Sequence, residues 1–300
     1  MGHSRRRRRR GRKRRRRPRR GRGADRVMTI PCDVSCAREV SRAGAAIAEG
    51  LGPIGVWVNC AMLTSFSPFP QMAPQEFEKI IDTTFLGVVN GTRTALSLMR
   101  RHGRGRIVTV GSGLGYRSVP FQSAYCASKH AINGFLASVR SELIREGADI
   151  TLGVVQLPAI DTPQFGWARN RLEEMPQPAP PIYKPELAAR AVMKAVRDGT
   201  REILVGRSVL QLVLGNMVLP GWLDRKLARA GAELQKSGHP EPGGRPDNID
   251  GPVAGVAARA HGRFGDRAAA EGIVVDGDRL RIAVFLGAPL LALAVGLVLG

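Results

Sequence analysis

The sequence predicts an α/β protein built on a doubly wound parallel sheet, and three observations support this prediction. Short apolar runs alternate with longer segments of helical periodicity between residues 27 and 206, which is typical of repeated strand–helix–strand units. Most of the apolar runs are continuous, as in strands that are covered on both faces. The chain has 300 residues, of which 43% are hydrophobic, so it is long enough for one large domain with a full core.

The first elements of this pattern are expected close to the arginine-rich beginning of the chain. Residues 27–34 (VMTIPCDV) are predicted to form a short buried strand. A helix is expected over 36–50, because Ser35 before it is a suitable N-cap. Residues 54–59 (IGVWVN) form a continuous apolar run and are predicted to be a strand with both faces covered.

Two long helices and several shorter elements complete the pattern. The long helices are predicted over 73–103, with Pro74 in the first turn, and over 121–147. The shorter elements are strands over 105–112, 150–157 and 202–206, and a helix over 184–199. The Pro-rich segment 158–183 is long for a loop, so we expect it to be functional and to cover a substrate.

Both ends of the chain differ in composition from the predicted domain, which we assign to 27–235. Residues 1–26 contain 16 Arg and Lys and one acid, and hold +15 of the formal net charge of +21, so a disordered basic tail is expected. Residues 236–275 are rich in Gly and Pro and are expected to be a polar linker. Residues 276–300 are expected to form a C-terminal hydrophobic helix that anchors the chain in a membrane.

A serine, a tyrosine and a lysine are spaced so that they can act together. Ser112 ends a predicted strand, at the sheet edge where ligands bind in doubly wound folds. Tyr125 and Lys129 lie four residues apart on the next helix, and therefore on one face. A carbonyl oxygen whose carbon receives a hydride needs a proton, which a tyrosine can supply if a nearby ammonium lowers its pKa from about 10.

We therefore interpret Tyr125 as a proton donor, Lys129 as the group that lowers the tyrosine pKa, and Ser112 as a hydrogen-bonding partner of the substrate oxygen. The alternative is that Tyr125 and Lys129 are ordinary residues on a solvated helix face. Their position directly after a strand that ends in serine favours the catalytic interpretation. No metal site is predicted, because the four cysteines lack the spacing of zinc ligands.

Residues 27–210 resemble the short-chain dehydrogenase/reductase family in the stretches PCDVS (31–35), VWVNCA (56–61), IVTVGSGLG (107–115), YCASK (125–129) and LPAIDTP (157–163). The resemblance implies a Rossmann-like fold, NAD or NADP as cofactor, and Ser112, Tyr125 and Lys129 as the catalytic residues. It also implies a set of cofactor-binding residues: Asp33, Val34, Asn59, Ala61, Tyr125, Lys129, Ile160 and Thr162.

The front of the sequence departs from the family's pattern. The family opens with a strand, a glycine-rich turn and a helix, whose backbone N–H groups receive the pyrophosphate. In the family's order PCDVS ends the third strand, so the fold is expected to be N-terminally truncated, with the arginines in place of the first elements. Either the arginine-rich residues come from a mistaken reading frame or start site, or the chain is genuine and has lost cofactor binding or gained a basic tail.

The sequence thus predicts an NAD(P)-dependent oxidoreductase that interconverts an alcohol and a carbonyl group of a small molecule. The alternative is a non-catalytic, membrane-attached binding protein on a degenerate dehydrogenase scaffold. A homo-oligomer is compatible with either. Nucleic acid is not an expected partner, because the arginine-rich tail has no aromatic residue to stack on bases. Arg279 and Arg281 flank the apolar run and predict a body on the cytoplasmic face of a membrane.

Residues 282–300 carry no charge, and 19 residues of helix span about 28 Å, close to the thickness of a hydrocarbon core of about 30 Å. We therefore expect the full chain to sediment with membranes and to resist carbonate extraction, and deletion of 276–300 to release it. A full-length chain that stays in the supernatant would contradict the anchor.

Overall fold

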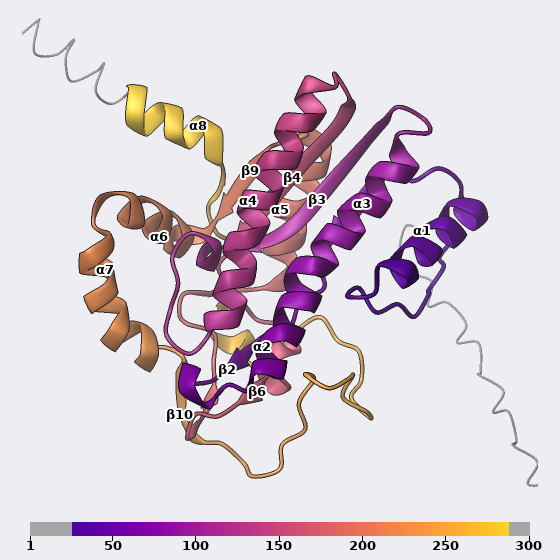
Figure 1. The fold of residues 1–300 in the computed structure, drawn as a ribbon. Coiled ribbons are helices and arrows are strands. Elements are labelled where there is room, and N and C mark those ends of the chain that lie inside the picture. Colours follow the sequence, from indigo (N-terminus) through magenta and orange to yellow (C-terminus); the bar gives the residue numbers. More distant parts are fainter. Residues whose placement is uncertain (1–25, 288–300) are drawn as a thin grey trace, which may run out of the picture. The chain divides into compact units, whose positions relative to one another are not determined.

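The computed structural model describes residues 26–287 of the chain (Figure 1). Residues 26–31 belong to a separate N-terminal unit and contain no helix or strand. The helices of the body, residues 32–287, are α1 Ala37–Leu51, α2 Pro74–Ile81, α3 Gly87–Met99, α4 Ser123–Arg145, α5 Pro185–Asp198, α6 Gly206–Val218, α7 Pro220–Lys226 and α8 Gly277–Ile282. Its strands are β1 Val56–Asn59, β2 Ser65–Phe66, β3 Arg104–Ser112, β4 Asp149–Leu157, β5 Ala159–Ile160, β6 Arg169–Asn170, β7 Glu174–Pro176, β8 Ile182–Tyr183, β9 Glu202–Val205, β10 Lys236–Pro240, β11 Ala268–Ala269 and β12 Val274–Asp276.

The central sheet has five strands in the order β1-β3-β4-β9-β12. The first four are parallel, and β12 pairs antiparallel with β9. Strands β3 and β4 pair along their whole length, and Ser112 stands opposite Leu157 at the last pair. Because these two strands end together, the residues that follow each of them leave the sheet at the same edge.

Helices cover both faces of this sheet (Figure 1). On one face α3 and α4 pack against β3 and β4, and Met99, Ile107 and Ile132 are fully buried between them. On the other face α5 packs with Leu187 and Ala191 against β3, β4 and β9. Successive side chains of β3 point to opposite faces of the sheet, and each face is covered by a buried cluster. Both sets of side chains are therefore apolar, which explains the continuous apolar run of β3. The predicted doubly wound α/β fold is therefore confirmed.

Strand β1 lies at the edge of the sheet, and here the prediction of a strand with two covered faces is wrong. Trp57 packs into the core below α3. Val56 and Val58 point to the opposite face of the strand from Trp57 and are 47% and 43% exposed, and Val58 lines the cavity described below. The strand predicted over 27–34 is also wrong: none of these residues joins a described sheet, and an extended segment without a neighbouring strand has no partner for its backbone groups.

The helix predicted over 73–103 is divided by a π-helical segment, Asp82–Leu86, between α2 and α3. Thr84 in this segment is fully buried. Its hydroxyl accepts a hydrogen bond from Leu63 N (2.9 Å) and donates one to Leu63 O (3.0 Å). The widened turn thus ties the helix to the segment that follows β1.

The segment 158–183 is packed against two other parts of the chain. It contributes β5 to β8, and these pair with β2, β10 and β11 as well as with each other. Phe165 lies 5.9 Å from Phe66 and 5.8 Å from Phe264, measured between ring centroids. Phe264 belongs to the expected linker 236–275. Ile249, Phe264 and Ala268 of this segment are buried, and Phe264 and Ala268 pack with Phe66 and Phe165.

The described C-terminal residues form α8 and a π-helical segment, Ala283–Gly287. The N-cap of α8 is Asp276. Its carboxylate accepts hydrogen bonds from the backbone N–H groups of Asp278 (2.9 Å) and Arg279 (3.1 Å). No helix within residues 26–287 has both the length and the apolar composition needed to cross a membrane. Most of the predicted hydrophobic helix, 288–300, lies outside the described residues.

Gly153 in the middle of β4 tests the packing of the sheet. A Cβ atom at this position would stand 2.6 Å from the backbone oxygen of Thr200, which cannot move without disturbing β9. We expect Gly153→Ala to lower the free energy of unfolding by about 1–3 kcal/mol, as measured by urea denaturation.

Gly134 on α4 is the matched control, because a Cβ there would meet no atom within 4 Å. Gly134→Ala should raise the stability by up to about 1 kcal/mol, since alanine favours a helix interior. Equal effects of the two substitutions would contradict the close approach at Gly153.

Candidate active site

A cavity of about 1020 Å³ lies at the carboxyl edge of the sheet, where β3 and β4 end. Five of the residues singled out in the sequence line it: Ser112, Tyr125, Lys129, Ile160 and Thr162. Ser112 comes from the end of β3, the next two from α4, and the last two from the segment after β4. The parallel register of β3 and β4 therefore brings together residues that are 50 positions apart in the sequence.

Ser112 is held in place through its backbone and its side chain. Its N–H donates to Gln156 Oε1 on β4 (2.9 Å), and its Oγ accepts from Leu114 N (3.1 Å). A side-chain hydrogen bond joins it to Tyr125. Residue 111 must be a glycine for Gln156 Oε1 to approach the backbone in this way. A Cβ atom at position 111 would lie only 2.4 Å from that oxygen.

Tyr125 and Lys129 lie one helical turn apart on α4, as their spacing predicts. The Lys129 ammonium is 5.4 Å from the centroid of the Tyr125 ring, and it donates a hydrogen bond to the backbone oxygen of Val110 (2.8 Å). Lys129 is only 4% exposed, and this burial lowers the pKa of its ammonium to about 8.

The electrostatic part of the sequence prediction differs from the structure. Burial raises the pKa of Tyr125, and the hydrogen bond from Ser112 offsets only part of this increase. The charge of Lys129 is directed to the Val110 carbonyl and the face of the aromatic ring, and burial outweighs it, so that the net change in the tyrosine pKa is an increase. Tyr125 is therefore held as a neutral phenol at neutral pH.

Four of the expected cofactor-binding residues do not line the cavity. The carboxylate of Asp33 accepts hydrogen bonds from Ser35, and Val34 packs against Gly87 at the start of α3. Ala61 is exposed just after β1.

The carboxamide of Asn59 is engaged within the fold. Its Oδ1 accepts from Trp57 Nε1 (2.8 Å), and its Nδ2 donates to Thr92 Oγ1 (3.2 Å) and Thr109 Oγ1 (3.3 Å). In this arrangement Asn59 fastens β1 to α3 and β3, and its amide is directed away from a ligand at the cavity.

A buried polar network that was not predicted from the sequence lies behind Ser112. Gln156 Nε2 donates to Asn133 Oδ1 (2.9 Å) and to Glu202 Oε1 (3.2 Å). Glu202, on β9, also accepts from the Tyr116 hydroxyl and forms an ion pair with Arg281 Nη1 of α8 (2.7 Å). Burial beside Glu202 raises the pKa of Tyr116 to about 12. The sequence does contain one sign of this network: a glutamine and a glutamate lie inside apolar strand runs, where buried polar residues need hydrogen-bonding partners.

Much of the cavity wall is formed by apolar side chains. Phe165 and Trp167 come from the segment after β4, and Leu212, Trp222 and Leu223 come from α6 and α7. A cavity of this volume and lining suits a ligand with an extensive apolar part.

The described residues fit one half of a nicotinamide dinucleotide. At the cavity, the buried ammonium of Lys129 and the hydroxyls of Ser112 and Thr162 can meet a ribose and a carboxamide. The other half is not matched: α1 begins at Ala37 without a preceding strand, and within residues 26–287 no glycine-rich turn joins a strand to a helix near it.

A doubly wound sheet with a serine, a tyrosine and a lysine around a cavity at its carboxyl edge defines the class of α/β proteins that bind ligands at their strand ends. The chain belongs to the short chain dehydrogenase family, whose model matches residues 6–172.

Similar proteins agree with this assignment. The uncharacterized oxidoreductase YxnA of Bacillus subtilis is 28% identical over 221 residues, which are 73% of this chain and 60% of YxnA. Ketoacyl reductase HetN of Nostoc is 29% identical over 194 residues, which are 65% of this chain and 66% of HetN. This chain thus spans less than two thirds of the length of these relatives.

Among solved structures, a short chain dehydrogenase from Burkholderia cenocepacia, crystallised in complex with NADP, superposes with a TM-score of 0.57. It is 22% identical, and the match covers 68% of this chain and 79% of that one. At this identity the likeness supports the fold of the sheet and its helices.

Lys129 gives a pH dependence that can be measured. The folded chain releases the lysine proton near pH 8, whereas the unfolded chain keeps it to about pH 10.5, so stability from this group rises between these values. We expect the parent to gain up to about 3 kcal/mol relative to Lys129→Met over this range, since one pKa unit corresponds to about 1.4 kcal/mol. Urea unfolding of both proteins across the range measures it, and a constant difference would contradict a lowered pKa.

Proposed function

We propose that this protein interconverts an alcohol and a carbonyl group with a nicotinamide cofactor. The observation that carries the proposal is the convergence of Ser112, Tyr125 and Lys129 on one cavity at the carboxyl edge of the sheet. The geometry suits the chemistry: a half-buried phenol that can donate a proton, a hydroxyl hydrogen-bonded to it, and a buried ammonium beside its ring.

In this mechanism the substrate oxygen lies between the Ser112 and Tyr125 hydroxyls. Ser112 donates a hydrogen bond that orients the oxygen, and Tyr125 donates its proton as negative charge develops there. Burial keeps the tyrosine in its protonated form before the charge appears. In the reverse direction the same oxygen of Tyr125 accepts the proton of the alcohol.

Lys129 serves two purposes in the proposal. Its ammonium stabilises the phenolate that remains after proton transfer, and it is placed to bind the hydroxyls of the nicotinamide ribose. A bound NAD or NADP supplies or accepts the hydride. The side chain of Thr162 and the segment around Ile160 line the cavity, and in the proposal they would orient the carboxamide and exclude water there.

The apolar walls favour a substrate with a long or bulky apolar part. The name of HetN, a ketoacyl reductase, describes a substrate of this kind, with a carbonyl next to an apolar chain. We therefore propose 3-oxoacyl thioesters as the first substrates to examine. The alternative of a non-catalytic binding protein has no specific observation in its favour, and attachment of the body to the cytoplasmic face of a membrane stays a prediction.

The test compares reduction rates of an apolar 3-oxoacyl thioester. Because the adenosine half of the cofactor is unmatched, the assay uses millimolar NADPH or NADH, and a second protein in which the corresponding front segment of YxnA precedes residue 27. Tyr125→Phe removes only the hydroxyl, so we expect the rate to fall by about 10²–10⁴ with little change in folding.

Tyr183→Phe is the matched control, because it makes the same chemical change at a buried tyrosine that does not line the cavity. Its rate should stay close to that of the parent. A Tyr125→Phe protein that keeps the parent rate on an accepted substrate would show that another group supplies the proton. A micromolar dissociation constant for NADPH on the unaltered chain would show that the phosphates are bound without a glycine-rich turn.

A further inference from the structure

The turn between α6 and α7 exposes a continuous apolar surface. Every residue from 217 to 222 is exposed, and the sequence there is MVLPGW. Met217, Val218, Leu219 and Trp222 are each more than half exposed. Large apolar side chains scattered singly on a surface need no explanation, but a contiguous group of them usually marks an interaction site.

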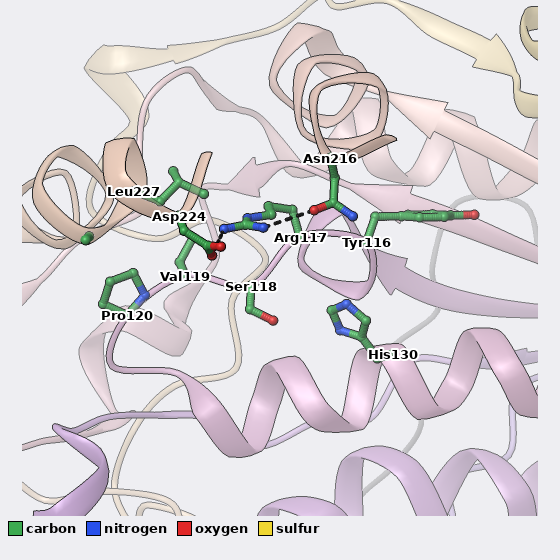
Figure 2. A pocket seen from close by; sticks show the side chains of 10 residues that line it. Tyr116, Arg117, Ser118, Val119, Pro120, His130, Asn216, Asp224 and Leu227 are labelled. Atoms are coloured by element: carbon green, nitrogen blue, oxygen red, sulfur yellow. Dashed lines mark hydrogen bonds and ion pairs between the residues drawn. The ribbon is translucent and has the colours of Figure 1, made fainter. Parts of the chain in front are cut away.

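The turn is held rigidly by a buried arginine. Figure 2 shows Arg117 reaching from the segment after β3 to Asn216 on α6 and Asp224 on α7, the two residues that flank the turn. Arg117 Nη1 donates to Asn216 Oδ1 (3.0 Å), and its other terminal nitrogen pairs with the carboxylate of Asp224. The arginine side chain is only 12% exposed. The apolar residues are therefore exposed on a fixed scaffold.

The same clamp determines the charge of the surface. Asp224 is the only acid of α7, and its charge is taken up by Arg117. The exposed charges that remain beside the turn are Arg225 and Lys226, followed by Arg229. The Lys226 ammonium lies 4.6 Å from the centroid of the Trp222 ring. A tryptophan and basic side chains beside an apolar turn are the groups that proteins place at the boundary of an anionic lipid bilayer.

The apolar surface also adjoins the cavity. Trp222 and Lys226 line the cavity and are at the same time exposed, whereas the neighbouring Leu223 is buried in its wall. A surface placed on the bilayer through residues 217–222 would thus open the cavity toward the lipid. That consequence rests on the proposed function, but the docking itself does not.

We propose that the α6–α7 turn docks on anionic membranes, with residues 217–222 at the level of the acyl chains and Arg225, Lys226 and Arg229 at the phosphates. The occupant is a lipid surface because of this charge complementarity. A second copy of the chain that met this turn on a two-fold axis would place the same basic residues close to each other, which is unfavourable. This surface is independent of the sequence expected to anchor the C-terminus.

The test uses the full chain and vesicles of phosphatidylcholine and phosphatidylglycerol with brominated acyl chains. Bromine quenches tryptophan only at close range, so binding of the vesicle by the arginine-rich or C-terminal residues alone gives no signal at the turn. We expect the fluorescence of the parent to be quenched, and the quenching to be lost in Trp222→Phe, which leaves half-buried Trp57 and Trp167 as the background.

Leu219→Asp should also abolish the quenching, since it places a charge in the acyl region, and its exposed position makes normal folding checkable by circular dichroism. Ile144→Asp is the matched control: Ile144 is 73% exposed at the end of α4, away from the turn, and its substitution should leave the quenching unchanged. Arg225→Glu with Arg229→Glu should weaken the quenching, as should vesicles of phosphatidylcholine alone.

Two results would overturn the proposal. One is a parent protein that sediments with the vesicles but shows no quenching that depends on Trp222. The other is a parent that is dimeric by sedimentation equilibrium and becomes monomeric as Leu219→Asp, without quenching in either form, which would assign the surface to a second copy of the chain.

Discussion

The carboxylate of Glu202 is buried at the start of β9, with only 1% of its side chain exposed, and much of the surrounding structure depends on it. A carboxylate taken out of water costs several kcal/mol unless it is paired and hydrogen-bonded. The partners come from three places: Arg281 from α8, Tyr116 from the turn after β3, and Gln156 from β4. Satisfying one buried group therefore fixes a strand, a turn and the last described helix against each other.

The consequence for the site follows through Gln156. One end of its carboxamide is held by Glu202 and Asn133, and the other receives the backbone N–H of Ser112. The serine at the cavity is thus positioned by side chains that do not line the cavity. A helix close to the end of the chain, α8, reaches the site through the same route, so residues far from the cavity in sequence determine its geometry. Such a network is effective only when every member is satisfied, because a missing partner leaves a buried polar group unpaired.

The cavity and the exposed turn of α6–α7 have a common structural origin. Residues 113–120 leave β3 beside Ser112, and they supply both Tyr116 to the Glu202 network and Arg117 to the clamp on Asn216 and Asp224. Neighbouring side chains thus point to the interior and to the α6–α7 pair. This arrangement fixes the apolar wall of the cavity relative to the serine, which a flexible lid could not do.

The sequence by itself determined β3, α4, β4, α5 and β9, the family, and the spacing of the serine, tyrosine and lysine, because these depend on local periodicity and on short motifs. Strands β5 to β8 lie in a segment that was predicted to be a loop. Only the tertiary structure decided which of the expected residues meet. Ile160 and Thr162 line the cavity, whereas the amide of Asn59 forms hydrogen bonds with Trp57, Thr92 and Thr109.

The pKa of Tyr125 could not be predicted from its spacing to Lys129, since burial outweighs a charge that is directed to a backbone carbonyl. Likewise, residues 236–275 have the composition of a linker. Phe264 of this segment nevertheless packs against Phe165, which is far from it in the sequence. Contacts between distant residues depend on how the chain folds back, and local patterns carry no record of them.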